Sequence, residues 1–340
     1  MKNITLTSTY NFASGYGELL YVLLNDLSHT GYNVIPRSYT SISEKYVSFF
    51  NKPYVHDSNL LDLSLLALSN EMSMQNFFTH IVFDRPRVLL TMWECTRMND
   101  LMIEILSKFT HIIVPNSYNK VNFLNQGLNT KIDVVPLFCD TDIFVYKNHD
   151  EKNKFVFGIS NEDPRKNLNK VINCFIKAFR GVNNVELQVK TCTPISNRIF
   201  DSRIKYINTK YTKEQLRDWY YNLDVYVSGA TCEGWGMMQQ ESMCCGRPII
   251  YTNYGGLKEF VNNQIGFEVN HQEEYSTNHW GDYAGLWSNF KENDMIDKMI
   301  YCYINRQEVI SKGKMAAISA NKYTKELFIK NLSTILNQYV

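Results

Sequence analysis

The residues between 228 and 259 include the side chains in this sequence that are best suited to chemistry. Glu233 lies in a segment with Gly234 and Gly236, and Glu241 follows it eight positions later. The glycines leave room for the backbone to approach a ligand closely. Carboxylates accept hydrogen bonds from hydroxyl groups, so the pair suits the hydroxyls of a sugar and the diol of a ribose. The segment therefore predicts a site for a ligand rich in hydroxyl groups.

The elements around these residues would place them at one edge of a parallel sheet. The apolar run 223–227 predicts a buried strand, 237–245 a helix and 249–252 a second strand. Gly246 and Pro248 would end the helix. This unit aims the helix N-terminus, with its free backbone N–H groups, at the carboxyl edge of the sheet, where open α/β folds hold anions. An anionic group is therefore expected beside the two carboxylates.

The same segment resembles a known family of enzymes. The run EGWG at 233–236, followed by Glu241 and by GRP at 246–248, is similar to the EGFG…E…CGxPV signature of retaining, nucleotide-sugar-dependent glycosyltransferases of family 4. The resemblance implies an α/β protein of the GT-B fold. Such a protein has two facing Rossmann-like domains with parallel sheets, and its C-terminal helix crosses back to the N-terminal domain. The implied reaction moves a sugar from a nucleoside diphosphate to a hydroxyl acceptor, with retention and without a metal.

The resemblance also implies roles for individual residues. In that family the first Glu of the pair contacts the donor sugar, the second holds the ribose, and backbone amides after the second Gly face the sugar and the distal phosphate. Glu233 is therefore expected to act in catalysis. The donor-binding residues implied here are Gly234, Trp235, Gly236, Met237, Met238 and Glu241.

Two cations after the apolar run 155–160 would stabilise the departing diphosphate. Family members have an Arg directly after this strand and a Lys about five residues further on. Lys166 matches the Lys, whereas Ser160 or Asn161 stands at the Arg position. We expect Arg165 to take the place of that Arg and to act in catalysis with Lys166. If it does not, a nucleotide-sugar-binding protein with poor catalysis is the alternative.

Two further segments are expected on the donor side. Gly15, Tyr16 and Gly17 precede an apolar helix expected from Glu18 onward, where family members carry a glycine-rich loop that approaches the donor phosphates. Lys190 ends a predicted strand and is assigned to donor binding as well. The expected co-substrate is a UDP- or GDP-linked sugar, with no other cofactor.

The acceptor side is expected near Trp93, Glu94 and Arg97, which follow another predicted strand. Trp93 could stack on a sugar, and Glu94 could orient or deprotonate an acceptor hydroxyl. Alternatively, this pair only closes the domain. Arg85 and Arg87 lie nearby in the sequence, and with Arg97 they are either solvated charges or a site for an acidic acceptor. A glycan or small molecule is the expected acceptor, and a modified nucleic-acid base is an alternative that only the arginines support.

The length of 340 residues predicts two domains. The expected division is 1–148 for an acceptor-side domain, 149–322 for a nucleotide-sugar-binding domain and 323–340 for a helix that packs on the first domain. The DTD sequence at 140–142 matches a metal-binding Asp-x-Asp pattern, but it lies in the expected linker, so no metal is predicted. Residues 271–286 are a polar, aromatic insertion to which the pattern assigns no role.

Composition excludes several classes of protein. The formal net charge of +1 gives no bulk attraction to nucleic acid or to an anionic membrane. The eight cysteines form no CxxC pair, and we interpret them as reduced and the protein as cytoplasmic. No apolar run approaches the roughly 18 residues of a membrane span. An epimerase or a phosphorylase of the same fold remains an alternative activity.

Overall fold

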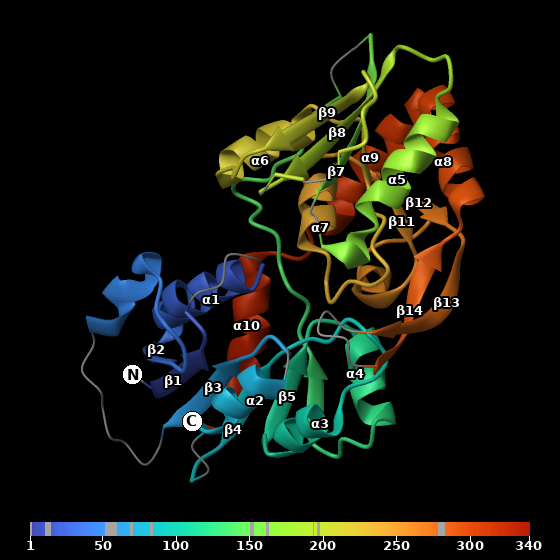
Figure 1. Cartoon of the computed structure of the whole chain (residues 1–340). Helices are drawn as coiled ribbons and strands as arrows, with labels where there is room; N and C mark the ends of the chain where they lie inside the picture. The colour runs from blue at the N-terminus through green and yellow to red at the C-terminus, as the bar shows by residue number, and fades with distance from the viewer. Residues whose placement is uncertain are drawn as a thin grey trace. The chain divides into compact units, whose positions relative to one another are not determined.

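The computed structural model describes residues 2–10, 15–51, 60–68, 71–81, 84–149, 153–160, 163–192, 194–195, 198–277 and 283–340. The chain divides into two units (Figure 1). The first contains Met1–Leu137, Ser276–Gly285 and Lys325–Val340, and the second contains Phe138–Tyr275 and Leu286–Thr324. The C-terminal helix therefore belongs to the first unit, as expected for a GT-B protein.

A six-stranded parallel sheet forms the centre of the first unit. Its strand order is β2-β1-β3-β4-β5-β6, and Ile4 pairs with Val34 on one side and with Leu61 on the other. Apolar residues along these strands are buried on both faces, which is typical of parallel sheets. The strands are β1 (Lys2–Ser8), β2 (Tyr32–Ser38), β3 (Leu61–Leu65), β4 (Arg87–Leu90), β5 (His111–Val114) and β6 (Lys131–Val134).

Helices connect these strands, and the polar residues before two of them act as caps. The Asn99 side chain accepts from the Met102 N–H, and the Asn116 side chain accepts from the Asn119 N–H. The helices are α1 (Gly15–Asn25), α2 (Glu71–Phe78), α3 (Asp100–Ser107), α4 (Ser117–Asn125) and α10 (Lys325–Leu336), with 3₁₀ turns η1 (Leu27–Thr30) and η2 (Glu44–Asn51).

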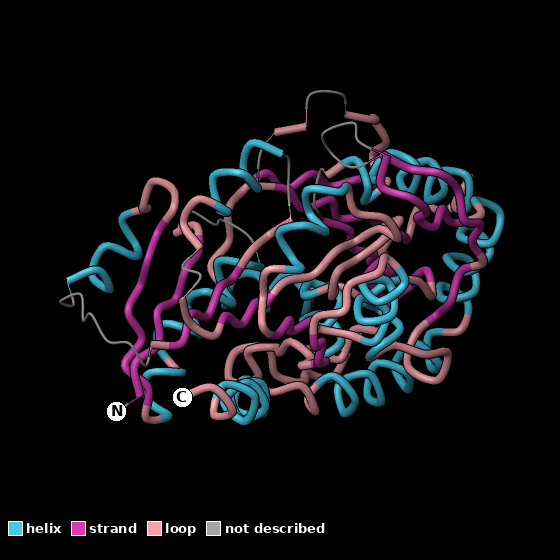
Figure 2. The backbone as a smooth tube through the Cα atoms, turned by 90° about the horizontal axis from the view of Figure 1, so that it is seen from below, coloured by secondary structure: helices cyan, strands magenta, loops and turns pink. Residues whose placement is uncertain are grey.

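Both ends of the chain lie close together in this first unit (Figure 1 and Figure 2). The Lys2 ammonium donates to Asn337 Oδ1 at 2.9 Å, and the Tyr32 hydroxyl donates to the same oxygen at 2.7 Å. These bonds fasten α10 to the edge of the sheet formed by β1 and β2.

The second unit repeats this construction. Its strands are also parallel, in the order β12-β11-β10-β7-β8-β9. They are β7 (Phe155–Ser160), β8 (Val185–Thr191), β9 (Ile204–Asn208), β10 (Val225–Val227), β11 (Ile249–Thr252) and β12 (Phe267–Val269). The helices are α5 (Leu168–Ala178), α6 (Lys213–Tyr221), α7 (Met237–Cys244), α8 (Glu292–Ile304) and α9 (Arg306–Ala320), with 3₁₀ turns η3 (Pro164–Lys166) and η4 (Gly255–Glu259).

The direction of strand addition reverses between β7 and β10. From β7 the chain adds β8 and β9 on one side, and it then returns to add β10, β11 and β12 on the other. In open α/β sheets, ligands bind outside the carboxyl ends of the strands at such a switch point. The segments that follow Ser160 and Val227 are therefore brought together by the topology itself.

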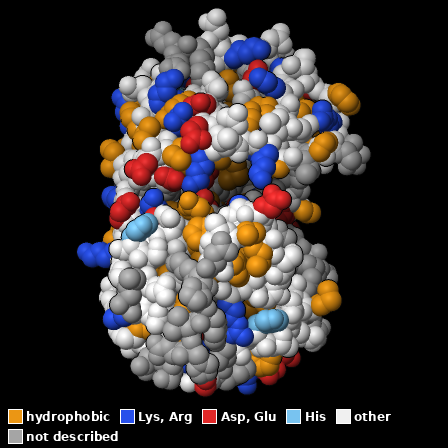
Figure 3. All heavy atoms as spheres, turned by 90° about the vertical axis from the view of Figure 1, so that its left-hand side faces the viewer, with side chains coloured by type: hydrophobic (Ala, Val, Ile, Leu, Met, Phe, Trp, Pro, Cys, Tyr) orange, Lys and Arg blue, Asp and Glu red, His pale blue; other side chains and the backbone are white. Residues whose placement is uncertain are grey.

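The polar insertion contains two strands that the sequence pattern did not predict. They are β13 (His271–Thr277) and β14 (Tyr283–Phe290), which form a two-stranded sheet. On the face of the molecule drawn in Figure 3, Lys and Arg side chains are interspersed with Asp and Glu side chains. That mixture agrees with the nearly balanced charge of the sequence.

Candidate functional site

Glu233 lies between two cations at the switch point of the second unit. Its Oε1 is paired with the Lys166 ammonium, and its Oε2 lies 3.3 Å from Arg165 Nη1. The same Arg165 nitrogen donates to the Cys232 carbonyl at 2.7 Å. Glu233 is only 5% exposed. Three residues that the sequence pattern assigned to catalysis are thus in direct contact.

This surrounding fixes the charge of Glu233. Burial alone would raise its pKa, but the positive charges of Lys166 and Arg165 outweigh that effect and lower the pKa to about 2. Glu233 is therefore ionised at neutral pH, and its oxygens can only accept hydrogen bonds. A donor such as a sugar hydroxyl is the kind of ligand group it can bind.

The loop that carries the cations is held by local caps. Asp163 caps the short η3 turn, with its side chain accepting from the Arg165 N–H at 3.1 Å. The Arg165 carbonyl accepts from the Thr231 N–H at 2.8 Å, and the Asn167 amide donates to the Gly229 carbonyl at 3.0 Å. These bonds tie the segment after β7 to the segment after β10.

Gly236 is required by both its conformation and its surroundings. Its φ is +102°, and an added Cβ would lie 2.5 Å from Leu257 Cδ2. Gly236 stands at the start of α7 and provides no side-chain cap, so the first turn, with Met237 and Met238, keeps backbone N–H groups that a ligand could use. The Glu233 carbonyl is held by the Gly256 N–H at 2.8 Å.

Glu241 has a side-chain donor that the sequence pattern did not reveal. The Tyr220 hydroxyl, on α6, donates to Glu241 Oε2 at 2.9 Å. Burial, followed by the charge of Glu241, raises the pKa of Tyr220 well above its ordinary value, so the phenol stays protonated and acts as a donor. The sequence places Tyr220 in a helix, but no spacing rule pairs it with position 241.

Trp235 and Lys190 occupy different environments. The Trp235 ring is in the core, with its centroid 4.9 Å from that of Phe260, and its Nε1 donates to Gln240 Oε1 at 2.7 Å. A direct contact between Trp235 and a donor would therefore come from its backbone. Lys190 ends β8 beside Ser160, and its ammonium lies 5.1 Å from the centroid of the Tyr211 ring.

Ser160 has no charge to offer at the position where the family carries an Arg. Its Oγ forms a hydrogen bond with the Tyr226 hydroxyl at 2.7 Å and contacts Met238 Sδ at 2.9 Å. The sequence neighbour Asn161 lies outside the described residues. That Arg165 replaces the family's Arg stays a prediction.

In the first unit, the glycine segment is part of a helix. Helix α1 begins at Gly15, so the expectation that it begins at Glu18 was wrong, and Gly15, Tyr16 and Gly17 form its first turn. The preceding residues 11–14 lie outside the described part of the chain. Burial is the main cause that raises the pKa of Tyr16, and the charge of Glu94 adds to it. This places the Tyr16 phenol close to the carboxyl end of β4.

The segment from Trp93 to Arg97 is closed on itself. Trp93 is 6% exposed, and its indole N–H donates to the Arg97 carbonyl at 2.6 Å. The Arg97 N–H donates to the Ala284 carbonyl at 2.9 Å, and its guanidinium lies 4.9 Å from the centroid of the Tyr283 ring. The Trp93 ring therefore supports this segment and presents little of its face to solvent.

The neighbouring arginines and the DTD segment have local partners. Arg85 pairs with Asp84 at 2.9 Å, and Arg87 donates to the Lys108 carbonyl. Asp140 pairs with Lys213 at 2.8 Å. Within the described residues, no group of three His, Cys, Asp or Glu side chains is arranged to hold a metal. Among those same residues, no helix is long and apolar enough to cross a membrane.

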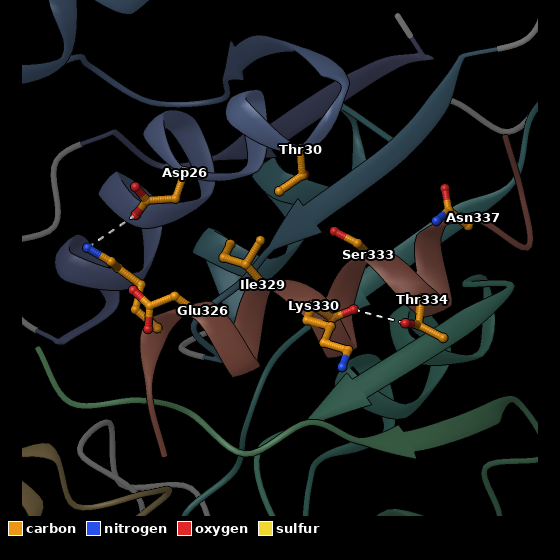
Figure 4. Close-up of a pocket in the computed structure, with 9 residues that line it drawn as sticks. Asp26, Thr30, Glu326, Ile329, Lys330, Ser333, Thr334 and Asn337 are labelled. Carbon is orange, nitrogen blue, oxygen red and sulfur yellow. Dashed lines mark hydrogen bonds and ion pairs between the residues drawn. The ribbon is translucent and has the colours of Figure 1, made fainter. Parts of the chain in front are cut away.

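A separate groove of about 510 Å³ lies in the first unit between η1 and α10 (Figure 4). Asp26 and Lys325 form an ion pair at 4.0 Å at one end, and Asn337 lies at the other. The residues that line this groove include none of those assigned to the site from the sequence. The groove therefore adds nothing to the site described above.

The fold and the site together define a class of protein. The chain superimposes over 99% of its length on 99% of the sucrose-phosphate synthase from Thermosynechococcus elongatus, with a TM-score of 0.72 and 12% identity. It superimposes over 82% of its length on 55% of TarM, with a TM-score of 0.64 and 17% identity. These likenesses confirm the predicted GT-B fold with two Rossmann-like units.

The family is also identified in the sequence. Residues 140–276 match the family described as Glycosyl transferases group 1. A stretch of 144 residues is 26% identical to a sucrose synthase of Nitrosomonas europaea and covers 41% of this chain and 16% of that protein. The chain thus spans less than two thirds of the length of that sucrose synthase and of TarM. Over residues 140–276 the chain belongs to the group 1 glycosyl transferases, which confirms the predicted class of enzyme.

Proposed function

We propose that this protein is a retaining glycosyltransferase that moves a sugar from a nucleoside-diphosphate sugar to a hydroxyl acceptor without a metal ion. The observation that carries the proposal is the buried cluster of Glu233, Arg165 and Lys166, which lies within the group 1 segment. Buried ion pairs contribute little net stability, because desolvation offsets their attraction. A ligand that uses these charges accounts for the cluster better than stability does.

Each charged group has a task in this proposal. Arg165, Lys166 and the N–H groups at the start of α7 would bind the diphosphate, while Glu233 accepts from a sugar hydroxyl and Glu241 from the ribose. As the bond from the anomeric carbon to the diphosphate breaks, a bond to the acceptor oxygen forms and the acceptor proton passes to the departing diphosphate. The cations stabilise the charge that develops there, and stabilisation of this kind commonly contributes most to the rate enhancement of an enzyme.

The donor is proposed to carry UDP, with GDP as the other candidate. TarM has been crystallised with UDP and α-GlcNAc-glycerol, and a pneumococcal O-GlcNAc transferase, GtfA, with UDP and GlcNAc. Both proteins share the fold of this chain. Lys190, at the carboxyl end of β8, is proposed to contact the donor as well.

The acceptor is proposed to be a glycan or a small molecule that contacts the first unit near Glu94 and Arg97. Glu94 would orient or deprotonate the acceptor hydroxyl. Trp93 is proposed to support this segment, since its indole is bonded to the Arg97 carbonyl. A modified nucleic-acid base has less support, because Arg85 and Arg87 are engaged within the protein.

A second candidate function rests on Ser160. The hydroxyl of Ser160 is committed to Tyr226 and Met238, so this position supplies no charge to a diphosphate. If Arg165 does not compensate, the protein binds a nucleotide sugar and transfers it poorly.

The two candidates are separated by a binding screen followed by a turnover assay. Thermal shifts with UDP, GDP, ADP and their glucose or mannose derivatives should rise with one nucleotide class. Release of that nucleotide from its sugar, faster in the presence of supplied glycan or polyol acceptors, supports the transferase. A thermal shift without release supports the binding protein, and neither shift nor release contradicts both.

A further inference from the structure

A neutral side chain holds the buried acid of the proposed site. Gln239, in the first turn of α7, is 3% exposed. Its Nε2 donates to Glu233 Oε1 at 2.7 Å and to Ser228 Oγ at 2.9 Å. Because an ionised carboxylate can only accept, the amide nitrogen must be the atom that faces Glu233. Both hydrogens of this amide are therefore used.

The other side-chain donors to Glu233 are the two cations. Lys166 shares Oε1 with Gln239, and Arg165 approaches Oε2. The proposed function assigns these same cations to the diphosphate, whose anionic oxygens would compete with Glu233 for them. An uncharged amide has no comparable attraction to the diphosphate. Gln239 is thus the donor that would stay on Glu233 when the donor sugar arrives.

The surroundings leave Gln239 little freedom to move. Ser228 is fixed at the end of β10, since its N–H donates to the Ile250 carbonyl at 2.8 Å. On the other side, a Cβ at Gly236 would lie 3.2 Å from Gln239 Oε1, so the glycine makes space for the amide. The amide is therefore held in one orientation toward Glu233.

We propose that Gln239 is a positioning residue for the transfer reaction. It keeps Glu233 ionised and directed at the donor sugar while Arg165 and Lys166 bind the diphosphate. This inference rests on the proposed function, and it adds a residue that neither the sequence signature nor the spacing of the two acids predicts.

The next residue in the chain provides a matched control. Gln240 is the same residue type in the same helix and is fully buried. Its Oε1 accepts from the Trp235 indole at 2.7 Å, on a different side of α7 from Glu233. Substitutions at 239 and 240 therefore carry similar costs of burial and helix propensity but affect different hydrogen bonds.

The test compares Gln239→Leu and Gln239→Glu with Gln240→Leu and Gln240→Glu in the full chain. The assay follows release of UDP from UDP-glucose or of GDP from GDP-mannose, whichever the wild type uses, between pH 5.5 and 8.5. Gln239→Leu should lower kcat by about 10- to 100-fold, because a hydrogen bond to a charged group is lost. Its affinity for the free nucleotide should stay within about threefold of the wild type, as should kcat of Gln240→Leu.

The Glu variants add a readout that a purely structural role would not change. At position 239 a carboxyl can donate to Glu233 only when it is protonated, and the neighbouring carboxylate raises its pKa. The rate of Gln239→Glu relative to wild type should therefore increase as the pH falls, whereas Gln239→Leu stays low at every pH. Gln240→Glu should show no such recovery, since an ionised carboxylate can still accept from Trp235.

The outcomes separate this inference from the function beneath it. An active wild type with Gln239→Leu equal to Gln240→Leu, or with no recovery of Gln239→Glu at low pH, overturns the positioning role alone. A wild type that releases no nucleotide from either donor overturns the proposed function and this inference with it.

Discussion

The two sheets of this protein are built alike, but their carboxyl edges offer different chemistry. In the second unit, charged side chains meet at the switch point between β7 and β10, and Glu233 is buried against Lys166 and Arg165. In the first unit, the segment after β4 is closed by bonds to backbone groups, such as that from the Trp93 indole to the Arg97 carbonyl. One edge is electrostatically prepared for a ligand, and the other is mainly shaped.

This difference teaches where specificity of each kind is encoded. A diphosphate can be recognised by a few cations and a helix N-terminus, so its site leaves a clear signal in charge and spacing. A neutral hydroxyl acceptor requires shape and a few polar groups, and those leave little signal in residue type. Substitutions in the second unit should therefore change donor chemistry strongly, and those in the first unit should leave it unchanged.

Removing a cation from the second unit should have the largest effect. Lys166→Ala should lower kcat by about 100-fold or more, because the charge on the departing diphosphate loses a preorganised partner. Steady-state kinetics with the preferred nucleotide sugar provides the measurement. Lys177→Ala is the matched control, since Lys177 pairs with Glu292 on α8 away from the site. Full activity of Lys166→Ala would remove it from the diphosphate site.

The ribose assignment predicts a smaller effect, on binding. Glu241→Ala should weaken nucleotide affinity by roughly 1–3 kcal/mol, and Tyr220→Phe by roughly 0.5–1.5 kcal/mol through loss of its bond to Glu241. Calorimetric titration with UDP or GDP measures both. The neighbouring Tyr221→Phe, whose hydroxyl donates to the Val145 carbonyl, should bind like the wild type. Equal affinities for wild type and Glu241→Ala would contradict the assignment.

The buried acid predicts a dependence of stability on pH. Because the folded pKa of Glu233 is lowered from 4.5 to about 2, its contribution is complete above pH 4.5 and is lost as the pH falls toward 2. The free energy of unfolding should therefore fall more steeply with acid in the wild type than in Glu233→Gln, by about 1–2 kcal/mol. Parallel pH curves for the two proteins would show that Glu233 is not held as an ion.

The first unit predicts the smallest effect. Trp93→Phe keeps the aromatic ring but loses the indole N–H that donates to Arg97, and it should destabilise the protein by about 1 kcal/mol. Nucleotide affinity should not change, and urea unfolding with a parallel UDP titration would check both. A Trp93→Phe protein that binds nucleotide poorly would break the contrast between the two edges.

Much of this fold could be predicted because apolar strands alternate with helices of clear periodicity. The runs at Phe155–Ser160 and Ile249–Thr252 became buried parallel strands, and Thr212 caps α6 with a full capping box. The run 60–68 was left undecided between helix and strand, because a short, fully buried apolar run has no period of its own. It contains β3.

The site could be predicted in part, for similar reasons. Glu233, Arg165 and Lys166 lie in loops whose meeting is dictated by strand order, so a signature and a topology were enough to propose them. Tyr220 and Gln239 contribute through hydrogen bonds made across the packed interior, which no spacing in the chain reveals. The strands β13 and β14 were missed because the insertion is polar and its pattern was assigned no structure.

A crystal structure of the full chain with bound UDP or GDP tests the central claim most directly. The account predicts diphosphate oxygens within hydrogen-bond distance of Lys166 Nζ and of the backbone N–H groups at the start of α7, with the ribose hydroxyls on Glu241. A nucleotide bound elsewhere, with Lys166 still paired to Glu233 and Glu241 still bound only within the protein, would contradict it.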